Sequence, residues 1–237
     1  MDEPRYAIYF VPPADSALYR FGAGVLGYDC YSGERLSHPQ DSALAASEWN
    51  ALTREPRNYG FHATLKAPFR LLPPFREADL AAELERFAAI PRTIPEIRPT
   101  VQSLAGFIAV VAGAPSMELD GLAADAVMAF DRFRRPLSSQ ERAQRLGAGL
   151  SDRQTDNLDR WGYPYVFEDF RFHMTLTGRI DAGRRGAMLA LLQGRFNAID
   201  GAHVLPVDRL ALLRQDARAL PFRMVRAAAL TPLRSGP

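Results

Sequence analysis

The sequence predicts an α+β fold built from two similar lobes. Short apolar runs rich in β-forming residues alternate with segments of helical periodicity along the chain. The pattern Phe-His-x-Thr-Leu occurs twice, at residues 61–65 and 172–176, and the motif histidines His62 and His173 are 111 residues apart, about half the chain. We expect a single domain over residues 1–237. Its pseudo-symmetric repeats, roughly 5–105 and 106–232, should carry antiparallel sheets that face a central cleft, with helices outside.

The first half reads as strand, helices, motif strand, helix and strand. Residues 6–11 predict a strand that stops at a Pro-Pro pair, and residues 15–25 follow helical spacing. Asp41 or Ser42 is a candidate cap for a helix that carries Trp49 and Leu52 on one face. A strand over 59–69 holds the first motif. A helix with Leu80 and Leu84 on its apolar stripe follows, and then a strand over 101–104; a further strand over 107–111 opens the second half.

The second half repeats this order. A helix runs from about residue 119 to the Arg-Arg-Pro sequence at 134–136. Ser138 with Glu141 and Ser151 with Gln154 are capping boxes, each predicting a short helix. The second motif lies in a strand predicted over 170–180, and Asp181 is a candidate cap for the next helix. Residues 207–213 and 222–230 finish the chain as strands.

Composition limits the classes of partner. The chain has 47% hydrophobic and 24% charged residues and a net charge of only +2, which argues against an extended nucleic acid or a membrane surface as the ligand. The single cysteine, Cys30, excludes an intramolecular disulfide and a cysteine-based zinc site. The first residues lack the pattern of a signal peptide, and no apolar run approaches the length of a membrane span. We therefore expect a cytoplasmic protein.

The two motifs predict a catalytic pair. In a strand, alternate side chains share a face, so His62, Thr64 and Lys66 should lie on one polar face. His173, Thr175 and Thr177 should form the other, with Arg171 and Arg179 beyond them. Cleaving a P–O bond needs one group that removes a proton and another that donates one, and imidazole titrates near neutral pH. The threonine hydroxyls and the cations are candidate ligands of the phosphate oxygens.

Other interpretations of these residues remain open. A single histidine in a strand is most often structural, but the duplication favours a functional pair. A metal site is possible because histidine is a common ligand, yet no carboxylate lies on the two polar faces and no metal motif is present, so we expect no metal and no cofactor. Tyr165, in the aromatic connector 161–165, is either turn packing or a wall for a base or sugar. His38 and His203 lack a matching environment and are expected in loops or on the surface.

Longer stretches around the motifs resemble a known family. They are Tyr-Gly-Phe-His-Ala-Thr-Leu-Lys-Ala-Pro-Phe at 59–69, Arg-Trp-Gly-Tyr-Pro-Tyr at 160–165, Phe-Arg-Phe-His-Met-Thr-Leu-Thr-Gly at 170–178 and Arg-Tyr-Ala-Ile-Tyr-Phe at 5–10. The paired His-x-Thr motifs resemble the 2H phosphoesterase superfamily, and the longer stretches resemble a bacterial branch encoded beside phosphonate-utilisation genes.

The resemblance implies a bilobal fold and a metal-independent mechanism. It implies catalysis by His62 and His173, with Thr64 and Thr175 contacting phosphate. From motif and resemblance together we expect hydrolysis of a cyclic phosphodiester, either a nucleotide 2′,3′-cyclic phosphate or a phosphoribosyl cyclic phosphate. The alternatives are 2′-5′ RNA ligation and a non-catalytic sensor of a phosphorylated metabolite. Either way the expected partner is a small phosphorylated molecule.

Overall fold

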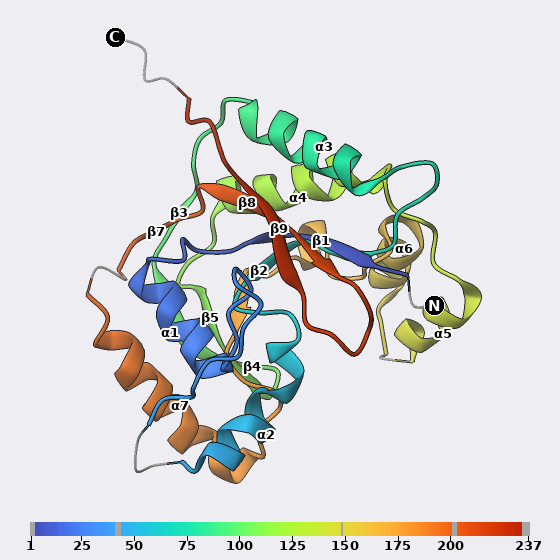
Figure 1. Cartoon of the computed structure of the whole chain (residues 1–237). Helices are drawn as coiled ribbons and strands as arrows, with labels where there is room; N and C mark the ends of the chain where they lie inside the picture. The colour runs from blue at the N-terminus through green and yellow to red at the C-terminus, as the bar shows by residue number, and fades with distance from the viewer. Residues whose placement is uncertain (1–2, 41–43, 148, 201–202, 234–237) are drawn as a thin grey trace.

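The computed structural model describes residues 3–40, 44–147, 149–200 and 203–233. It is a mixed α+β structure, as predicted. Seven strands form one antiparallel sheet in the order β4-β5-β6-β2-β1-β8-β9 (Figure 1). Their bounds are Pro99–Leu104 (β4), Phe107–Ala112 (β5), His173–Thr175 (β6), Ala63–Phe69 (β2), Arg5–Phe10 (β1), Arg209–Gln215 (β8) and Arg223–Ala229 (β9). Two short strands that sequence reasoning missed, β3 (Glu96–Ile97) and β7 (Leu205–Pro206), pair separately.

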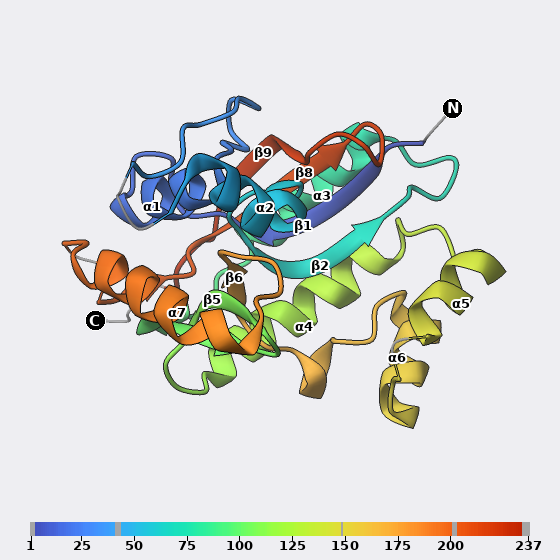
Figure 2. The same ribbon diagram turned by 90° about the horizontal axis from the view of Figure 1, so that it is seen from below.

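The sheet differs from the expected pair of separate sheets. The two motif strands, β2 and β6, pair directly through Ala63 and Met174. This pairing joins the strands of both halves into one continuous sheet (Figure 2). The order also mixes the halves, because β4 from the first half lies beside β5, and β8 from the second half lies beside β1.

Helices pack on both ends of this sheet. Their bounds are Ala17–Leu26 (α1), Ala46–Arg57 (α2), Glu77–Ala89 (α3), Met117–Asp131 (α4), Ser139–Leu146 (α5), Asp152–Trp161 (α6) and Ala182–Asn197 (α7), with a short 3-10 turn at Phe167–Asp169. Helix α3 packs on β8 and β9, α4 packs on β2, and α7 packs on β4. In Figure 1, α5 and α6 lie together at the end of the molecule where β1 begins.

Local sequence signals explain most helix starts. Ser138 and Ser151 both form the predicted capping boxes, with Glu141 and Gln154 as the reciprocal partners. Asp181 stands at the predicted N-cap position of α7 but makes no side-chain cap hydrogen bond. The predicted cap at Asp41 or Ser42 lies outside the described residues. None of the helices within the described ranges is long and apolar enough to cross a bilayer.

The second motif strand is shorter than predicted. Only His173–Thr175 form β6, although residues 170–180 were expected to continue it. The carbonyl of Ile108 accepts hydrogen bonds from the amides of both Leu176 and Thr177, at 2.9 and 3.2 Å. Two successive amides on one carbonyl end the regular ladder, because each ladder carbonyl otherwise takes one partner.

Candidate active site

The sheet brings the four motif side chains together. Ala63 and Met174 are fully buried and form the registered pair between β2 and β6. Continuing this antiparallel register by one residue in each direction sets His62 opposite Thr175, and Thr64 opposite His173. All four side chains are half-buried, on the face opposite to Ala63 and Met174. The motif residues of both halves therefore share one patch of the sheet.

Both imidazoles are oriented in the same way. His62 Nδ1 donates to the carbonyl of Gly60 at 2.9 Å, and His173 Nδ1 donates to the carbonyl of Arg171 at 2.7 Å. Because a carbonyl oxygen only accepts, each Nδ1 carries the proton, and the lone pair of each neutral ring is on Nε2. The Thr64 hydroxyl lies 3.2 Å from His62 Nε2 and can donate to it. Each ring thus presents Nε2 for proton exchange.

The environment favours the neutral form of both rings. Burial lowers the pKa of His62 to about 4; the hydrogen bond that His62 donates to the Gly60 carbonyl opposes this effect, and the charge of His173 adds to it. Burial also lowers the pKa of His173, opposed by the hydrogen bond to Arg171. A bound anion would raise both pKa values, because it stabilises the charged imidazolium. Binding of a negatively charged ligand would therefore favour protonation of the imidazoles.

A pocket of about 390 Å³ opens beside His62 and Thr64. Its aromatic walls are Tyr9, Tyr59, Tyr163 and Tyr165, and its cations are Arg5 and Arg145. None of the described residues that line it is acidic. A concave surface with positive charge and no carboxylate favours an anionic ligand.

Tyr9 was missed by the sequence analysis, as were Arg5 and Arg145. Arg5 and Tyr9 are four residues apart in β1, so strand alternation alone could have placed them on one face. Arg145 comes from the last turn of α5, which nothing in the sequence connects to the motif strands. Only the tertiary structure brings it to the pocket.

Lys66 lies away from this pocket. In the pairing of β1 with β2, Tyr9 is opposite Thr64 and Ile8 is opposite Lys66, so Leu65 is an extra residue in β2. Such a bulge shifts the alternation by one position. Ala67 consequently lines the pocket, whereas Lys66 is buried and donates to the Asp131 carboxylate at 2.6 Å. The sequence expectation that Lys66 shares a face with His62 does not hold, because it assumed unbroken alternation.

The other expected ligand residues occupy different places. The Thr177 hydroxyl is fully buried between backbone groups, accepting from the amide of Ile108 and donating to the carbonyl of Gly178. Arg171 is exposed and contributes its carbonyl to His173. Arg179 is exposed and lines a separate pocket with Arg184. Of this group only Tyr165, which is 44% exposed, lines the pocket beside His62.

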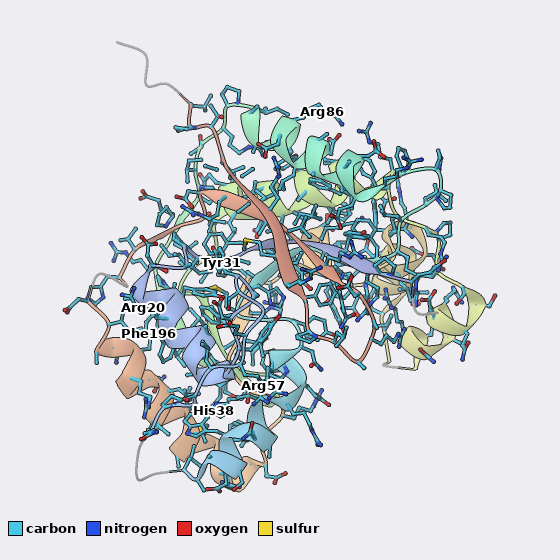
Figure 3. The ribbon with its side chains drawn as sticks, in the orientation of Figure 1. Arg20, Tyr31, His38, Arg57, Arg86 and Phe196 are labelled. Atoms are coloured by element: carbon cyan, nitrogen blue, oxygen red, sulfur yellow. The ribbon has the colours of Figure 1, made fainter. Side chains whose placement is uncertain are left out.

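His38 and His203 lie outside the site. His38 contacts Arg57, whose Nη2 is 3.0 Å from His38 Nε2, and the two side chains lie side by side in Figure 3. Both bind carbonyls at the end of α1, His38 that of Val25 and Arg57 that of Leu26. Their role is therefore to satisfy the end of a helix. His203 is exposed.

No group of three or more His, Cys, Asp or Glu side chains within the described part of the chain is arranged to hold a metal ion. The pocket instead offers the imidazole of His62, two guanidinium groups and several hydroxyls, and the paired strand β6 adds the imidazole of His173 beside it. These groups donate hydrogen bonds and exchange protons, which is what a phosphate ester requires of its surroundings.

The fold and the site define an α+β protein whose sheet carries two His-x-Thr motifs side by side. The chain belongs to the family described as a protein of unknown function, DUF1045, whose profile matches residues 64–223. This range includes Thr64, His173 and Thr175, and begins two residues after His62.

Two curated relatives are similar to nearly the whole chain. One is the ribose 1,5-bisphosphate phosphokinase PhnN of Janthinobacterium sp. (strain Marseille), 38% identical over 92% of this chain and 49% of the relative. The other is the protein of the same name from Laribacter hongkongensis (strain HLHK9), 34% identical over 94% of this chain and 51% of the relative. The chain thus spans about half the length of these relatives.

These names contradict the activity predicted from the sequence. Both relatives are named as phosphokinases, which transfer a phosphoryl group to an acceptor, and not as cyclic phosphodiesterases, RNA ligases or sensors. The prediction was wrong because paired histidines report only how protons move during displacement at phosphorus. They leave the donor and the acceptor of the phosphoryl group unspecified.

Proposed function

We propose that the chain is an enzyme, or the part of one, that catalyses phosphoryl transfer at a phosphorylated ribose in phosphonate metabolism. The proposal is carried by the paired imidazoles, each held by its Nδ1 on a carbonyl two residues earlier, beside a pocket with cations and no acidic lining. The names of the relatives support ribose phosphate as the substrate class. We further propose that the chain is one domain of the bilobal 2H phosphoesterase type.

The order of the strands in the sheet supports the proposed bilobal architecture. From the junction of β2 and β6, the sheet order reads outwards as β2-β1-β8-β9 on one side and β6-β5-β4 on the other. Each motif strand is followed along the chain by a helix that packs, on the same side of the junction, on a strand from the other half of the sequence: α3 on β8, and α7 on β4. Such an arrangement is what two exchanged repeats of the sequence would produce.

In the proposed reaction, His62 is the base. Its neutral Nε2 takes the proton from the attacking hydroxyl as the new P–O bond forms. His173, protonated when the anionic substrate is bound, gives its proton to the leaving oxygen as the old P–O bond breaks. Thr64 and Thr175 hydrogen-bond the non-bridging oxygens, on which charge is concentrated in the transition state.

The test is phosphorus NMR of the chain with ribose 1,5-bisphosphate, ATP and Mg²⁺. We expect transfer of a phosphoryl group from ATP to the sugar phosphate. His62→Ala and His173→Ala should each slow it by roughly 10²- to 10⁴-fold, the usual contribution of a general acid or base. His203→Ala is the matched control, since that side chain is exposed and distant from the motifs.

Two results would contradict the proposal. Wild-type protein that transfers no phosphoryl group would rule out the reaction class for this chain. Transfer that survives unchanged in either motif variant would instead rule out the acid–base roles of the histidines. Circular dichroism of each variant separates a loss of chemistry from a loss of fold.

A further inference from the structure

Two arginines beside His62 are held only by neutral groups. Arg5 Nε donates to Gln215 Oε1 at 2.8 Å, and Arg145 Nη1 donates to the carbonyl of Gly162. Within the described ranges neither guanidinium forms an ion pair with a carboxylate. Both line the pocket. Their position is fixed by these hydrogen bonds, but their positive charge is left without a counter-charge in contact.

Neighbouring arginines show the opposite arrangement. Arg70, close to the same end of the sheet, pairs with Glu141, and Arg142 on α5 pairs with Asp159. Arg134 pairs with Asp131. Burial lowers the pKa of Arg145; Glu141 and Tyr163 oppose this effect, and the charges of Arg5 and Arg218 add to it. Like charges thus face each other at the pocket, an arrangement that an anionic ligand would relieve.

The Tyr9 hydroxyl is a third polar group to consider in this pocket. It is fully buried and has no hydrogen-bond partner among the described residues. Burial raises its pKa well above the usual value; Tyr59 and Tyr163 raise it further and Arg5 lowers it, and all three line the same pocket as Tyr9. Buried polar groups are nearly always paired in native proteins, so an orphan hydroxyl beside two uncompensated cations indicates a missing polar partner.

We propose that Arg5, Arg145 and Tyr9 form a second phosphate-binding subsite, and that the substrate is therefore a ribose carrying two phosphate groups. One phosphate lies at the His-x-Thr motifs and the other at this subsite. A guanidinium fork matches two phosphate oxygens, and the Tyr9 hydroxyl donates to a third. This inference rests on the proposed function, because it takes the substrate class from there.

The test compares the binding of two probes by isothermal titration calorimetry. Ribose 1,5-bisphosphate and ribose 5-phosphate differ by one phosphate group, so the ratio of their Kd values reports the second subsite. We expect wild type to prefer the bisphosphate by roughly 10- to 100-fold, the value of one or two charge-assisted hydrogen bonds. Arg5→Gln, Arg145→Gln and Tyr9→Phe should each reduce this preference while the Kd of the monophosphate changes little.

The matched control is Arg142→Gln. It removes the same charge from the same helix, α5, but from a side chain that pairs with Asp159 and does not line the pocket. It should leave the preference unchanged. Arg145→Lys keeps the charge without the fork and should retain part of the preference. Thermal melts show which variants remain folded.

The outcomes separate this inference from the proposed function. If wild type binds both probes equally, or if the preference survives in Arg5→Gln and Arg145→Gln, the second subsite is wrong and the proposed function stands. If neither probe binds wild type, the substrate class is wrong, and the subsite inference falls with it. A preference lost in the pocket variants and kept in Arg142→Gln supports both.

Discussion

Tyr9 stacks on His62, with ring centroids 3.7 Å apart and an angle of 24° between the rings. Tyr9 is also the cross-strand partner of Thr64, so one fully buried side chain touches two residues of the first motif. The stack supports one face of the imidazole, and the Gly60 carbonyl fixes Nδ1. His62 is therefore positioned by the two strands together and not by its own strand alone.

Substitution of Tyr9 should separate packing from hydrogen bonding. Tyr9→Phe keeps the stacked ring and removes a buried hydroxyl without a partner, so the free energy of unfolding should stay equal or rise by up to about 1 kcal/mol. Tyr9→Ala leaves a cavity and should cost about 3–5 kcal/mol. Urea denaturation measures both. A large loss of stability in Tyr9→Phe would mean that the hydroxyl has a partner in the folded protein.

Stability should fall at acidic pH partly because of His62. Its folded pKa of about 4 lies below the unfolded value near 6.5, so between these values the unfolded chain binds the proton more strongly. The contribution of the neutral ring is complete above pH 6.5 and is lost as the pH falls towards 4.

The measurement is urea denaturation at several pH values, with His62→Gln as the reference that cannot titrate. Between pH 7 and pH 4, wild type should lose about 3 kcal/mol more than this variant. Equal losses would show that His62 has an ordinary pKa in the folded protein. Proton NMR of the imidazole Cε1 proton gives the same pKa directly.

The Lys66–Asp131 pair should matter for stability and not for catalysis. Lys66 is 3% exposed, and burial lowers its pKa to about 8, although the hydrogen bond to Asp131 and the charge of that carboxylate raise it. Asp131→Ala leaves a buried ammonium without its partner and should cost about 3 kcal/mol, whereas Lys66→Met should stay within about 1 kcal/mol of wild type. The phosphoryl-transfer rate of Lys66→Met should be unchanged. A lower rate in this variant, if it is folded, would mean that Lys66 takes part in substrate binding after all.

Gly60 should tolerate no side chain. Its φ of +73° favours glycine, and a Cβ there would come within 2.9 Å of Cys30 Cβ. Gly60→Ala should cost about 2 kcal/mol or more and should displace the carbonyl that orients His62. Gly186→Ala in α7, where a Cβ meets nothing within 4 Å, is the control and should raise stability by about 0.5–1 kcal/mol. Equal effects at both positions would mean that Gly60 has no special conformation.

Much of the fold follows from local sequence patterns. The strand that became β1 and the capping boxes at Ser138 and Ser151 were predicted because propensity and capping are local properties. The duplicated motif likewise predicted that His62 and His173 share a site, and the direct pairing of β2 with β6 brings them together.

The other features of the fold and the site depend on contacts between residues that are far apart in the sequence. The bulge at Leu65, which turns Lys66 away, exists only in the pairing of β2 with β1. Arg145 reaches the pocket because of how α5 packs, and no spacing in the sequence reports that packing. The motif also does not specify which groups are exchanged at phosphorus, and the names of the relatives contradict the activity that was predicted from it.

The junction of β2 and β6 has one registered residue pair, Ala63 with Met174, whereas β4 and β5 share a ladder of six. The pairing of β2 with β6, which joins the two sides of the sheet, is therefore the shortest strand pairing in it. The two imidazoles lie on either side of this residue pair. A small rotation at this pairing would change the separation of the two imidazoles, which are the proposed base and acid. The alignment of the proposed catalytic groups thus depends on the shortest strand pairing of the sheet, so a ligand that contacts both motifs would hold the two strands together and fix the separation of the imidazoles.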